Sequence, residues 1–157
     1  MIRKIKPDDK KELVNILERV TQFSDLEKDT AIELIDESIF NADSGYYNTF
    51  VYEENGSILG YHCTGPRALT DGVFDMYWIV VDPTIRAKGI GAKLLAHSEE
   101  FVLQSKGRLL LAETSSLPIY ENARKFYIKN NFVVLAEIKD FYKIGDDLVI
   151  FGKYLTT

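Results

Sequence analysis

Helical spacing of apolar residues dominates the first part of the chain. Ile2 and Ile5 indicate a short opening strand, and Pro-Asp-Asp at residues 7–9 predicts the start of a helix. A second helix follows and ends in segment 41–45, where Asn, Asp, Ser and Gly favour irregular backbone. The apolar stripes are Leu13, Ile16, Leu17 and Val20 in the first helix, and Ala31, Leu34, Ile35 and Ile39 in the second.

Strand periodicity then predicts two antiparallel hairpins. Residues 50–53 and 58–63 flank Glu-Asn-Gly-Ser, and Asn-Gly between two such runs is a strong hairpin signal. At the other end of the chain, residues 132–138 and 148–154 are predicted strands joined across Gly-Asp-Asp at residues 145–147. An exposed final strand of this kind can pair with a second copy to form a homodimer, or its charged side chains can block such pairing.

Between the hairpins lies a strand, loop, helix and strand unit. Residues 73–81 are aromatic and β-branched on both faces, which is typical of a central strand covered from both sides. Asp-Pro at residues 82–83 ends that strand, and residues 90–104 have helical apolar spacing. Residues 109–112 form the next predicted strand, which completes an α/β pattern of strands and helices.

Composition and charge narrow the possible classes of protein. The 157 residues, 46% of them hydrophobic, suit a single compact domain spanning residues 1–157. A formal net charge of −5 argues against nucleic acid as a partner. No apolar run is long enough for a signal peptide or a bilayer span, so we expect no membrane partner and a cytoplasmic location. The single Cys63 cannot form an intrachain disulfide, and His62 and His97 lack a carboxylate at ligand spacing, so no metal site is expected.

The loop before the predicted helix 90–104 carries the most informative local motif, Arg86-Ala87-Lys88-Gly89-Ile90-Gly91. Two glycines let the backbone approach a ligand, the first amides of a helix lack intrahelical partners, and Arg86 and Lys88 add positive charge. The loop lacks the Gly-Lys-Ser/Thr of a Walker loop and the third glycine of a dinucleotide fingerprint. It therefore favours a pyrophosphate ligand, although an ordinary tight packing turn explains the glycines equally well.

This motif resembles the hallmark Arg/Gln-x-x-Gly-x-Gly/Ala of the Gcn5-related N-acetyltransferase (GNAT) family. A second resemblance lies in the helix predicted after Pro118, where residues 123–132 read Ala-Arg-Lys-Phe-Tyr-Ile-Lys-Asn-Asn-Phe against the family's Ala-x-x-Phe-Tyr-x-x-x-Gly-Phe. Asn131 replaces the glycine, and Tyr120 stands where many relatives carry an Asn that contacts pantetheine, with Asn122 as an alternative contact. The order of elements matches over nearly the whole chain. It implies a mixed, mostly antiparallel sheet that is flanked by helices and splayed at the acetyl-CoA site.

The resemblance implies acetyl-CoA as co-substrate and direct transfer of its acetyl group to a primary amine, with a small-molecule acceptor favoured. A protein N-terminus or lysine is the alternative acceptor, and a non-catalytic CoA-binding sensor is the alternative function. Residues 86–91 would cradle the pyrophosphate. The backbone of Ile79 and Val81 would pair with pantetheine where a β-bulge commonly opens the sheet, although the sequence carries no signal for such a bulge.

Three side chains are candidates for the chemistry. Tyr127 matches the family's proton donor, since a phenol stays protonated at neutral pH, whereas the helix pattern alone makes it one more buried aromatic. Glu113, which ends the predicted strand 109–112, is one candidate for the base that accepts the amine proton, or else a solvated acid. Asp75, the only charge in its strand, is the competing base or a partner for the substrate ammonium.

Two further expectations concern the surroundings of these residues. In a regular strand, Asp75 shares its face with Tyr77, Ile79 and Val81. Arg67, in a loop where relatives build the acceptor pocket, could hold a carboxylate of the substrate.

Overall fold

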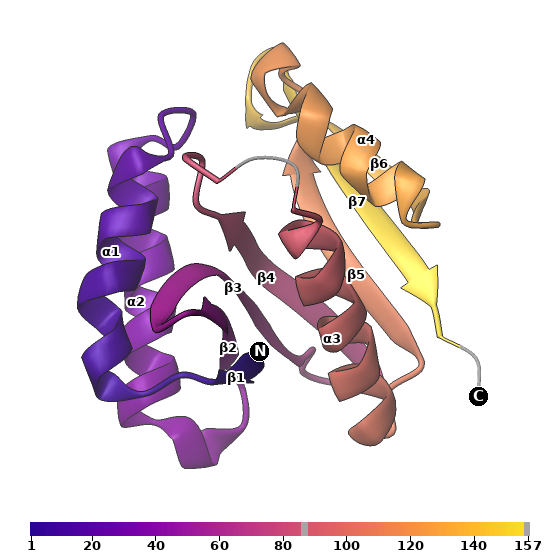
Figure 1. Ribbon diagram of the computed structural model, residues 1–157. Helices are drawn as coiled ribbons and strands as arrows, with labels where there is room; N and C mark the ends of the chain where they lie inside the picture. Colours follow the sequence, from indigo (N-terminus) through magenta and orange to yellow (C-terminus); the bar gives the residue numbers. More distant parts are fainter. Residues whose placement is uncertain (86–87, 156–157) are drawn as a thin grey trace.

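One seven-stranded sheet, in the order β1-β2-β3-β4-β5-β7-β6, runs through the molecule and carries helices on both faces (Figure 1). The computed structural model describes residues 1–85 and 88–155. The strands are β1 (Ile2–Lys4), β2 (Asn48–Glu54), β3 (Ser57–Pro66), β4 (Val73–Val81), β5 (Leu109–Ser115), β6 (Val133–Lys143) and β7 (Asp146–Tyr154). All neighbouring strands pair antiparallel except β4 and β5, which are parallel. The predicted mixed, mostly antiparallel sheet is confirmed.

Helices cover the two faces of the sheet in pairs. They are α1 (Lys10–Arg19), α2 (Asp25–Phe40), α3 (Ile90–Gln104) and α4 (Glu121–Lys129), with short 3-10 turns η1 (Pro7–Asp9), η2 (Ala42–Ser44) and η3 (Pro118–Tyr120). On the α1 face, Leu13 and Ile35 of α1 and α2 pack against Tyr61 and Val80 of the sheet. The α4 face is covered by α3 and α4, whose buried side chains share one apolar cluster with Phe74, Met76, Ala112 and Phe151. None of the helices in the described parts of the chain is long and apolar enough to cross a membrane.

Local turn chemistry explains where several elements end. Asn55 and Gly56 both have positive φ, 52° and 79°, which is the backbone that a two-residue hairpin between β2 and β3 requires. At the end of α4, Asn131 takes the left-handed conformation, with φ 66°, that Gly usually supplies. The final hairpin is longer than predicted because β6 continues to Lys143 through an irregular stretch in which Asp140 has positive φ.

The strands β4 and β5 separate soon after they begin. They pair only over residues 73–75 of β4 and 109–111 of β5, whereas β4 continues beside β3 to Val81 and β5 continues beside β7 to Ser115. Figure 1 shows the two strands fanning apart toward the start of α3. Beyond these positions, one edge of each strand has no strand partner among residues 1–85 and 88–155.

A β-bulge in β4 overturns one prediction about the faces of this strand. Cys63 pairs with Trp78 while Thr64 pairs with Met76, so Tyr77 is an extra residue without a partner in β3. The insertion shifts the alternation by one position. Ile79 and Val81 therefore pack against α3 on the α4 face, and they do not share a face with Asp75 as regular alternation predicted.

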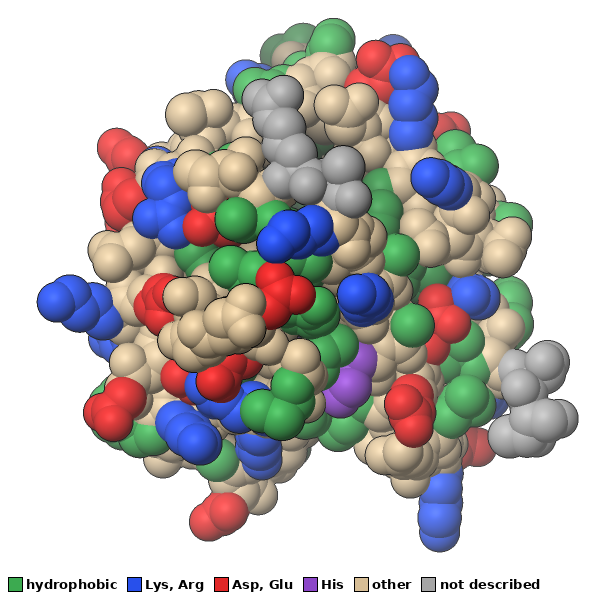
Figure 2. Space-filling view, viewed as in Figure 1, with side chains coloured by type: hydrophobic (Ala, Val, Ile, Leu, Met, Phe, Trp, Pro, Cys, Tyr) green, Lys and Arg blue, Asp and Glu red, His purple; other side chains and the backbone are tan. Residues whose placement is uncertain are grey.

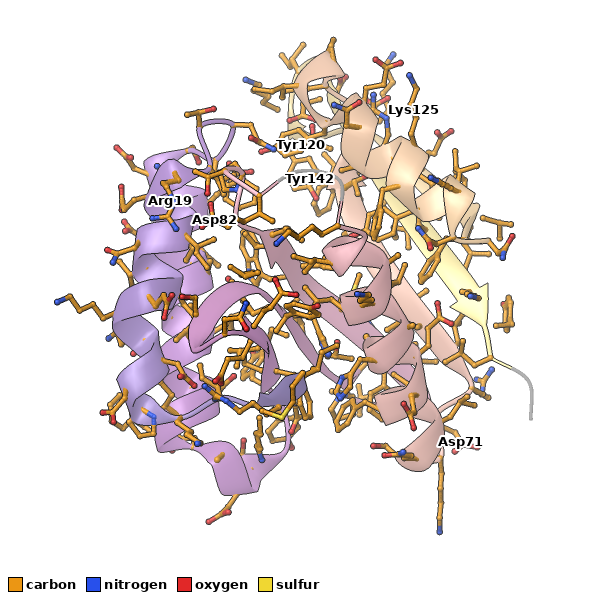
Figure 3. The ribbon with its side chains drawn as sticks, viewed as in Figure 1. Arg19, Asp71, Asp82, Tyr120, Lys125 and Tyr142 are labelled. Carbon is orange, nitrogen blue, oxygen red and sulfur yellow. The ribbon has the colours of Figure 1, made fainter. Side chains whose placement is uncertain are left out.

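Two buried carboxylates link helical segments to the sheet, one at its edge strand β1 and the other at the end of the central strand β4. Asp9 accepts hydrogen bonds from Arg3 Nη1 at 2.8 Å and Nη2 at 2.9 Å, and from the backbone N–H of Lys6 at 2.7 Å. Asp82, which follows β4, accepts from Arg19 Nη2 at 2.6 Å, and Figure 3 shows these two side chains side by side. Burial by itself raises the pKa of each carboxyl, but the hydrogen bonds outweigh it and hold both pKa values below their ordinary range.

Acidification is expected to destabilise the protein through these two groups. A carboxyl whose pKa is lower in the folded state stabilises the fold above its unfolded pKa of about 4, and that contribution disappears as pH falls through the folded pKa. Urea unfolding between pH 7 and pH 3 measures the loss. The variant carrying Asp9→Asn and Asp82→Asn should show a weaker pH dependence over this range; an equal dependence would assign the loss to other groups.

Candidate active site

The first turn of α3 faces the open end of the splay, and its backbone N–H groups precede the helix's own hydrogen bonds. Gly89 precedes the helix in a left-handed conformation, with φ 64°, and has no side chain with which to cap it. The backbone N–H of Lys93 donates to Gly89 O at 3.1 Å, so the amides of residues 90–92 precede the first intrahelical hydrogen bond. Such a helix start attracts an anion through both its N–H groups and its dipole.

The other residues of the predicted pyrophosphate loop divide into three groups. Arg86 and Ala87 lie outside the described residues. Lys88 is exposed, and its ammonium lies 3.2 Å from the Glu54 carboxylate. Ile90 is buried and anchors the helix start. A Cβ on Gly91 would lie 3.3 Å from the Phe126 ring, so a glycine here lets α3 approach α4 closely.

Alternation along β4 directs the backbone of Ile79 and Val81 into the splay. The N–H of Asp82 donates to Leu59 O of β3 at 2.8 Å. Because the backbone groups of every second residue in a strand point to the same side, the N–H and C=O groups of Asp82 and Val80 both point to β3. Those of Ile79 and Val81 point the other way, toward the gap left by β5. This is the orientation that backbone pairing with an extended ligand requires.

Tyr127 of α4 lies above the apex of the splay. It is 6% exposed and shares an apolar cluster with Met76 and Ala112, the residues that follow the last paired positions of β4 and β5. Its ring stacks on Phe151 at 5.4 Å between centroids and is tilted against Phe132. Burial raises the pKa of Tyr127 well above its ordinary value, so the phenol keeps its proton at neutral pH.

On the α1 face, the structure brings the two candidate carboxylates together. The guanidinium of Arg67 lies 3.2 Å from Asp75 Oδ1 through Nη1 and 3.7 Å from Glu113 Oε1 through Nη2. Glu113 lies inside β5 and does not end it, because pairing with β7 continues to Ser115. The Asp75 side chain is only 14% exposed. Burial raises its pKa, Arg67 opposes that rise and Glu113 adds to it, so Asp75 takes up a proton more readily than an ordinary Asp.

Tyrosine side chains surround this carboxylate pair. The Tyr77 ring lies 5.0 Å from that of Tyr47, and burial together with Asp75 raises the pKa of Tyr77 to about 12. Burial, Glu113 and Asp146 raise the pKa of Tyr142 to about 12. Tyr142 lies in the irregular part of β6, where no sequence pattern indicated a role, and Figure 3 shows it near Tyr120 at the open end of the splay.

Tyr120 bridges the two halves of the molecule. Its hydroxyl donates to Glu27 Oε1 at 2.7 Å, and the other oxygen of this carboxylate accepts from the backbone N–H of Ser24 at the start of α2. Tyr120 thus links η3 to the first turn of α2. Asn122, the alternative pantetheine contact, lies exposed on α4.

The surface between the helices carries both apolar and charged groups. Figure 2 shows hydrophobic side chains in the centre of the face between α1 and α3, with Lys and Arg side chains beside them. An extended ligand with an apolar arm and an anionic end matches this distribution. The site therefore combines an anion-binding helix start, an unpaired strand edge, a buried phenol and two carboxylates around one gap.

Comparison with known proteins gives a consistent picture. Residues 45–134 match the family model described as an acetyltransferase (GNAT) domain. The chain is 34% identical to a GNAT-family protein from Desulfovibrio desulfuricans of known structure, with a TM-score of 0.95 and coverage of 99% of both chains. None of the curated protein sequences matches it.

Two more distant structures share the fold alone. The ribosomal-protein-S18-alanine N-acetyltransferase from Escherichia coli is 19% identical, with a TM-score of 0.76 and coverage of 100% of this chain and 94% of that one. The aminoglycoside 6′-N-acetyltransferase from Enterococcus faecium is 12% identical, with a TM-score of 0.75 and coverage of 100% and 98%. One of these proteins is named for a protein acceptor and the other for a small molecule, so the fold by itself does not identify the acceptor.

Proposed function

Because the chain belongs to the GNAT acetyltransferase family, we propose that it transfers an acetyl group from acetyl-CoA directly to a primary amine of a small molecule. One domain spanning residues 1–157 carries the activity. The observation that supports this most is the gap between β4 and β5, which has the start of α3 at its open end and Tyr127, Asp75 and Glu113 around its apex.

The described residues fit acetyl-CoA along this gap. The amides of the first turn of α3 bind the pyrophosphate, Gly89 leaves open space beside them, and Lys88 adds positive charge. Ile79 and Val81 offer their backbone N–H and C=O groups to the pantetheine amides. Arg86 and Ala87 belong to the same pyrophosphate loop in the sequence-based prediction. Asn122 remains the predicted side-chain contact to pantetheine. When bound, acetyl-CoA supplies a thioester whose carbonyl carbon is attacked by the amine.

Side chains of this protein accept and donate the protons of the proposed reaction. Asp75 or Glu113 accepts a proton from the substrate ammonium, directly or through a water molecule, and frees the nitrogen lone pair. As the new N–C bond forms and the C–S bond breaks, Tyr127 donates its proton to the departing sulfur and regains one from the amide nitrogen. The products are the acetylated amine, the free thiol of CoA and one proton, which the carboxylate releases to solvent.

The shape and charge of the acceptor side favour a small molecule. The Asp75 side chain is only 14% exposed, and the contact of Tyr120 with Glu27 joins η3 to the first turn of α2 beside the splay. Glu113 is more exposed, at 40%, so it is the recessed Asp75 that favours a small amine over a bulky protein acceptor. A protein N-terminus or lysine is the alternative acceptor, and a CoA-binding sensor without turnover is the alternative function.

Gly91→Glu should weaken acetyl-CoA binding at least about tenfold, a change of about 1.4 kcal/mol. The new carboxylate would stand in the first turn of α3, where it competes with the pyrophosphate for the same N–H groups and dipole. A Cβ at this position would also lie 3.3 Å from the Phe126 ring, so part of any loss comes from packing between α3 and α4. Isothermal titration calorimetry measures the effect, with Gly91→Ala as the uncharged control. Equal affinities for the two variants would rule out this helix start as the pyrophosphate site.

The proposed reaction is tested by acetyl-CoA-dependent release of free thiol with amino acids, polyamines, aminoglycosides and short peptides as acceptors. We expect release with one class of small amine and little with peptides. Release with peptides alone would identify a protein acceptor. Acetyl-CoA binding without release for any acceptor would favour the sensor.

A homodimer and a cytoplasmic location remain predictions of the sequence. The final strand β7 lies between β5 and β6, so the prediction that the final strand forms the exposed edge is wrong, and β6 forms it instead. Val133, Leu135 and Ile138 of β6 are between 40% and 54% exposed, which supports a homodimer through this edge. Light scattering after size exclusion measures the mass. A monomer at micromolar concentration would contradict the homodimer.

A further inference from the structure

The side chain of Arg67 lies at the apex of the splay, where β4 and β5 separate. It directly follows β3, and its backbone is held in the turn toward β4 by hydrogen bonds from its N–H to Val73 O at 2.8 Å and from Thr70 Oγ1 to its carbonyl at 2.7 Å. From this anchored backbone the guanidinium reaches Asp75 of β4 and Glu113 of β5. One side chain thus spans the end of one strand and the two strands that separate.

The charges around Asp75 come from several elements. Arg67 faces it from the end of β3, Glu113 from β5 and Tyr77 from its own strand, with Tyr47 packed against Tyr77. Two carboxylates close together do not both remain ionised easily, because the charge of one favours protonation of the other. Arg67 supplies the positive charge that offsets this repulsion.

We propose that Arg67 is a positioning residue for acetyl transfer, which holds Asp75 and Glu113 together in their charged form so that one of them can accept the proton of the acceptor ammonium. This inference rests on the proposed function. In the step, the N–H bond of the ammonium breaks and an O–H bond forms on the carboxylate, so a carboxyl that is already protonated cannot take part. Because the guanidinium is already engaged with two carboxylates, it is poorly placed to hold a carboxylate of the substrate.

Removal of the guanidinium charge should move the pH profile of the reaction. Without Arg67, the Asp75 and Glu113 pair keeps a proton up to a higher pH, so the acid limb of kcat/KM shifts upward in Arg67→Gln. A buried opposite charge at this distance changes the pKa of a carboxyl by about 1 to 3, and the partial exposure of Arg67 reduces the expected change in pKa to about 0.5 to 1. At alkaline pH the variant should return to within about threefold of the wild type, which corresponds to about 0.7 kcal/mol.

Three comparison variants separate a change in proton affinity from simple damage. Arg67→Lys keeps a positive charge and should shift the limb less than Arg67→Gln. Arg108→Gln removes an arginine that directly precedes β5 and whose Nε donates to Asp71 O, at the other end of the β3–β4 turn that begins with Arg67; this variant should leave the profile unchanged. Adding Glu113→Gln to Arg67→Gln removes the like charge beside Asp75 and should return the limb toward lower pH.

The proposal would be overturned if Arg67→Gln lowered kcat/KM by the same factor at every pH and the acid limb of the profile stayed at its wild-type pH. The proposal can also be tested without turnover, by NMR titration of protein labelled with ¹³C at the Asp and Glu carboxyl carbons. The Asp75 signal should titrate at higher pH in Arg67→Gln than in the wild type, and an unmoved titration would overturn the role of Arg67. If the wild type proves inactive with every acceptor while this shift is present, the proposed function fails and the electrostatic inference stands.

Discussion

Replacing Tyr127 with Phe should lower kcat about a hundredfold and leave the affinity for acetyl-CoA nearly unchanged. Protonation of a leaving group by a positioned side chain contributes about a hundredfold or more to rate, and the substitution removes only the hydroxyl that we propose as the proton donor. The phenyl ring keeps its packing on Phe151 and Phe132. Steady-state kinetics with an accepted amine and calorimetric titration with acetyl-CoA measure the two quantities.

The pH dependence gives a second signature of Tyr127. Because burial raises its pKa well above the ordinary value of about 10, loss of its proton should not limit the wild-type rate below that pH. A fall in the wild-type rate near pH 8 must then come from another group, and Tyr127→Phe should show the same fall.

Tyr61→Phe is the matched control for this substitution. Tyr61 is fully buried in the cluster on the α1 face, and among the described residues its hydroxyl has no hydrogen-bond partner. Loss of that hydroxyl should leave kcat unchanged. It should change the free energy of unfolding by no more than about 1 kcal/mol. If Tyr127→Phe retained more than half of the wild-type kcat, the proton would have to come from water or from another side chain.

Gly65→Ala should destabilise the fold by about 3 kcal/mol, the largest stability effect that we expect from adding a single methyl group. A Cβ at this position of β3 would collide with the carbonyl oxygen of Tyr46 and lie 2.7 Å from its carbonyl carbon. Backbone atoms cannot rotate away as a side chain can. Asn48 also fixes this segment, because its Nδ2 donates to Gly45 O at 2.8 Å and to Thr64 O at 3.1 Å.

The same substitution should affect the acceptor side of the site more than the donor side. The displaced segment carries Tyr47, which packs against Tyr77, so KM for the amine should rise while the affinity for acetyl-CoA is kept. Urea unfolding measures the stability, and Gly91→Ala is the control, because its Cβ would meet only the Phe126 ring at 3.3 Å and the Val81 side chain at 3.8 Å. A change of less than about 0.5 kcal/mol for Gly65→Ala would contradict the close approach of these two segments.

Several features of the candidate site could be predicted because they depend on the spacing of residues close together in the sequence. Gly89 and Gly91 at the start of α3, and Phe126 and Tyr127 in α4, are spaced by the local periodicity of loop and helix. Asp75 stood out because a lone charge in an apolar strand needs a partner. These features depend on a few consecutive residues, so a single sequence carries them.

Partners that come from distant segments could not be predicted in the same way. Arg67 joins Asp75 and Glu113 only because β3, β4 and β5 meet where the splay begins. Tyr120 donates to Glu27, which lies 93 positions away, and His62 Nε2 lies 2.9 Å from His97 Nδ1 across the space between β3 and α3. Nothing in the spacing of these residues along the chain indicates which pairs come together.

The sequence by itself determined the order and type of the elements, the hairpin at Asn55 and Gly56 and the end of α4 at Asn131, because helix and strand periods and turn chemistry act over short stretches of chain. The tertiary structure decided the bulge at Tyr77, the faces that Ile79 and Val81 take, and the extension of β5 past Glu113. Strand register is fixed by pairing and packing with other strands and helices, and a shift of one residue sends every later side chain to the opposite face.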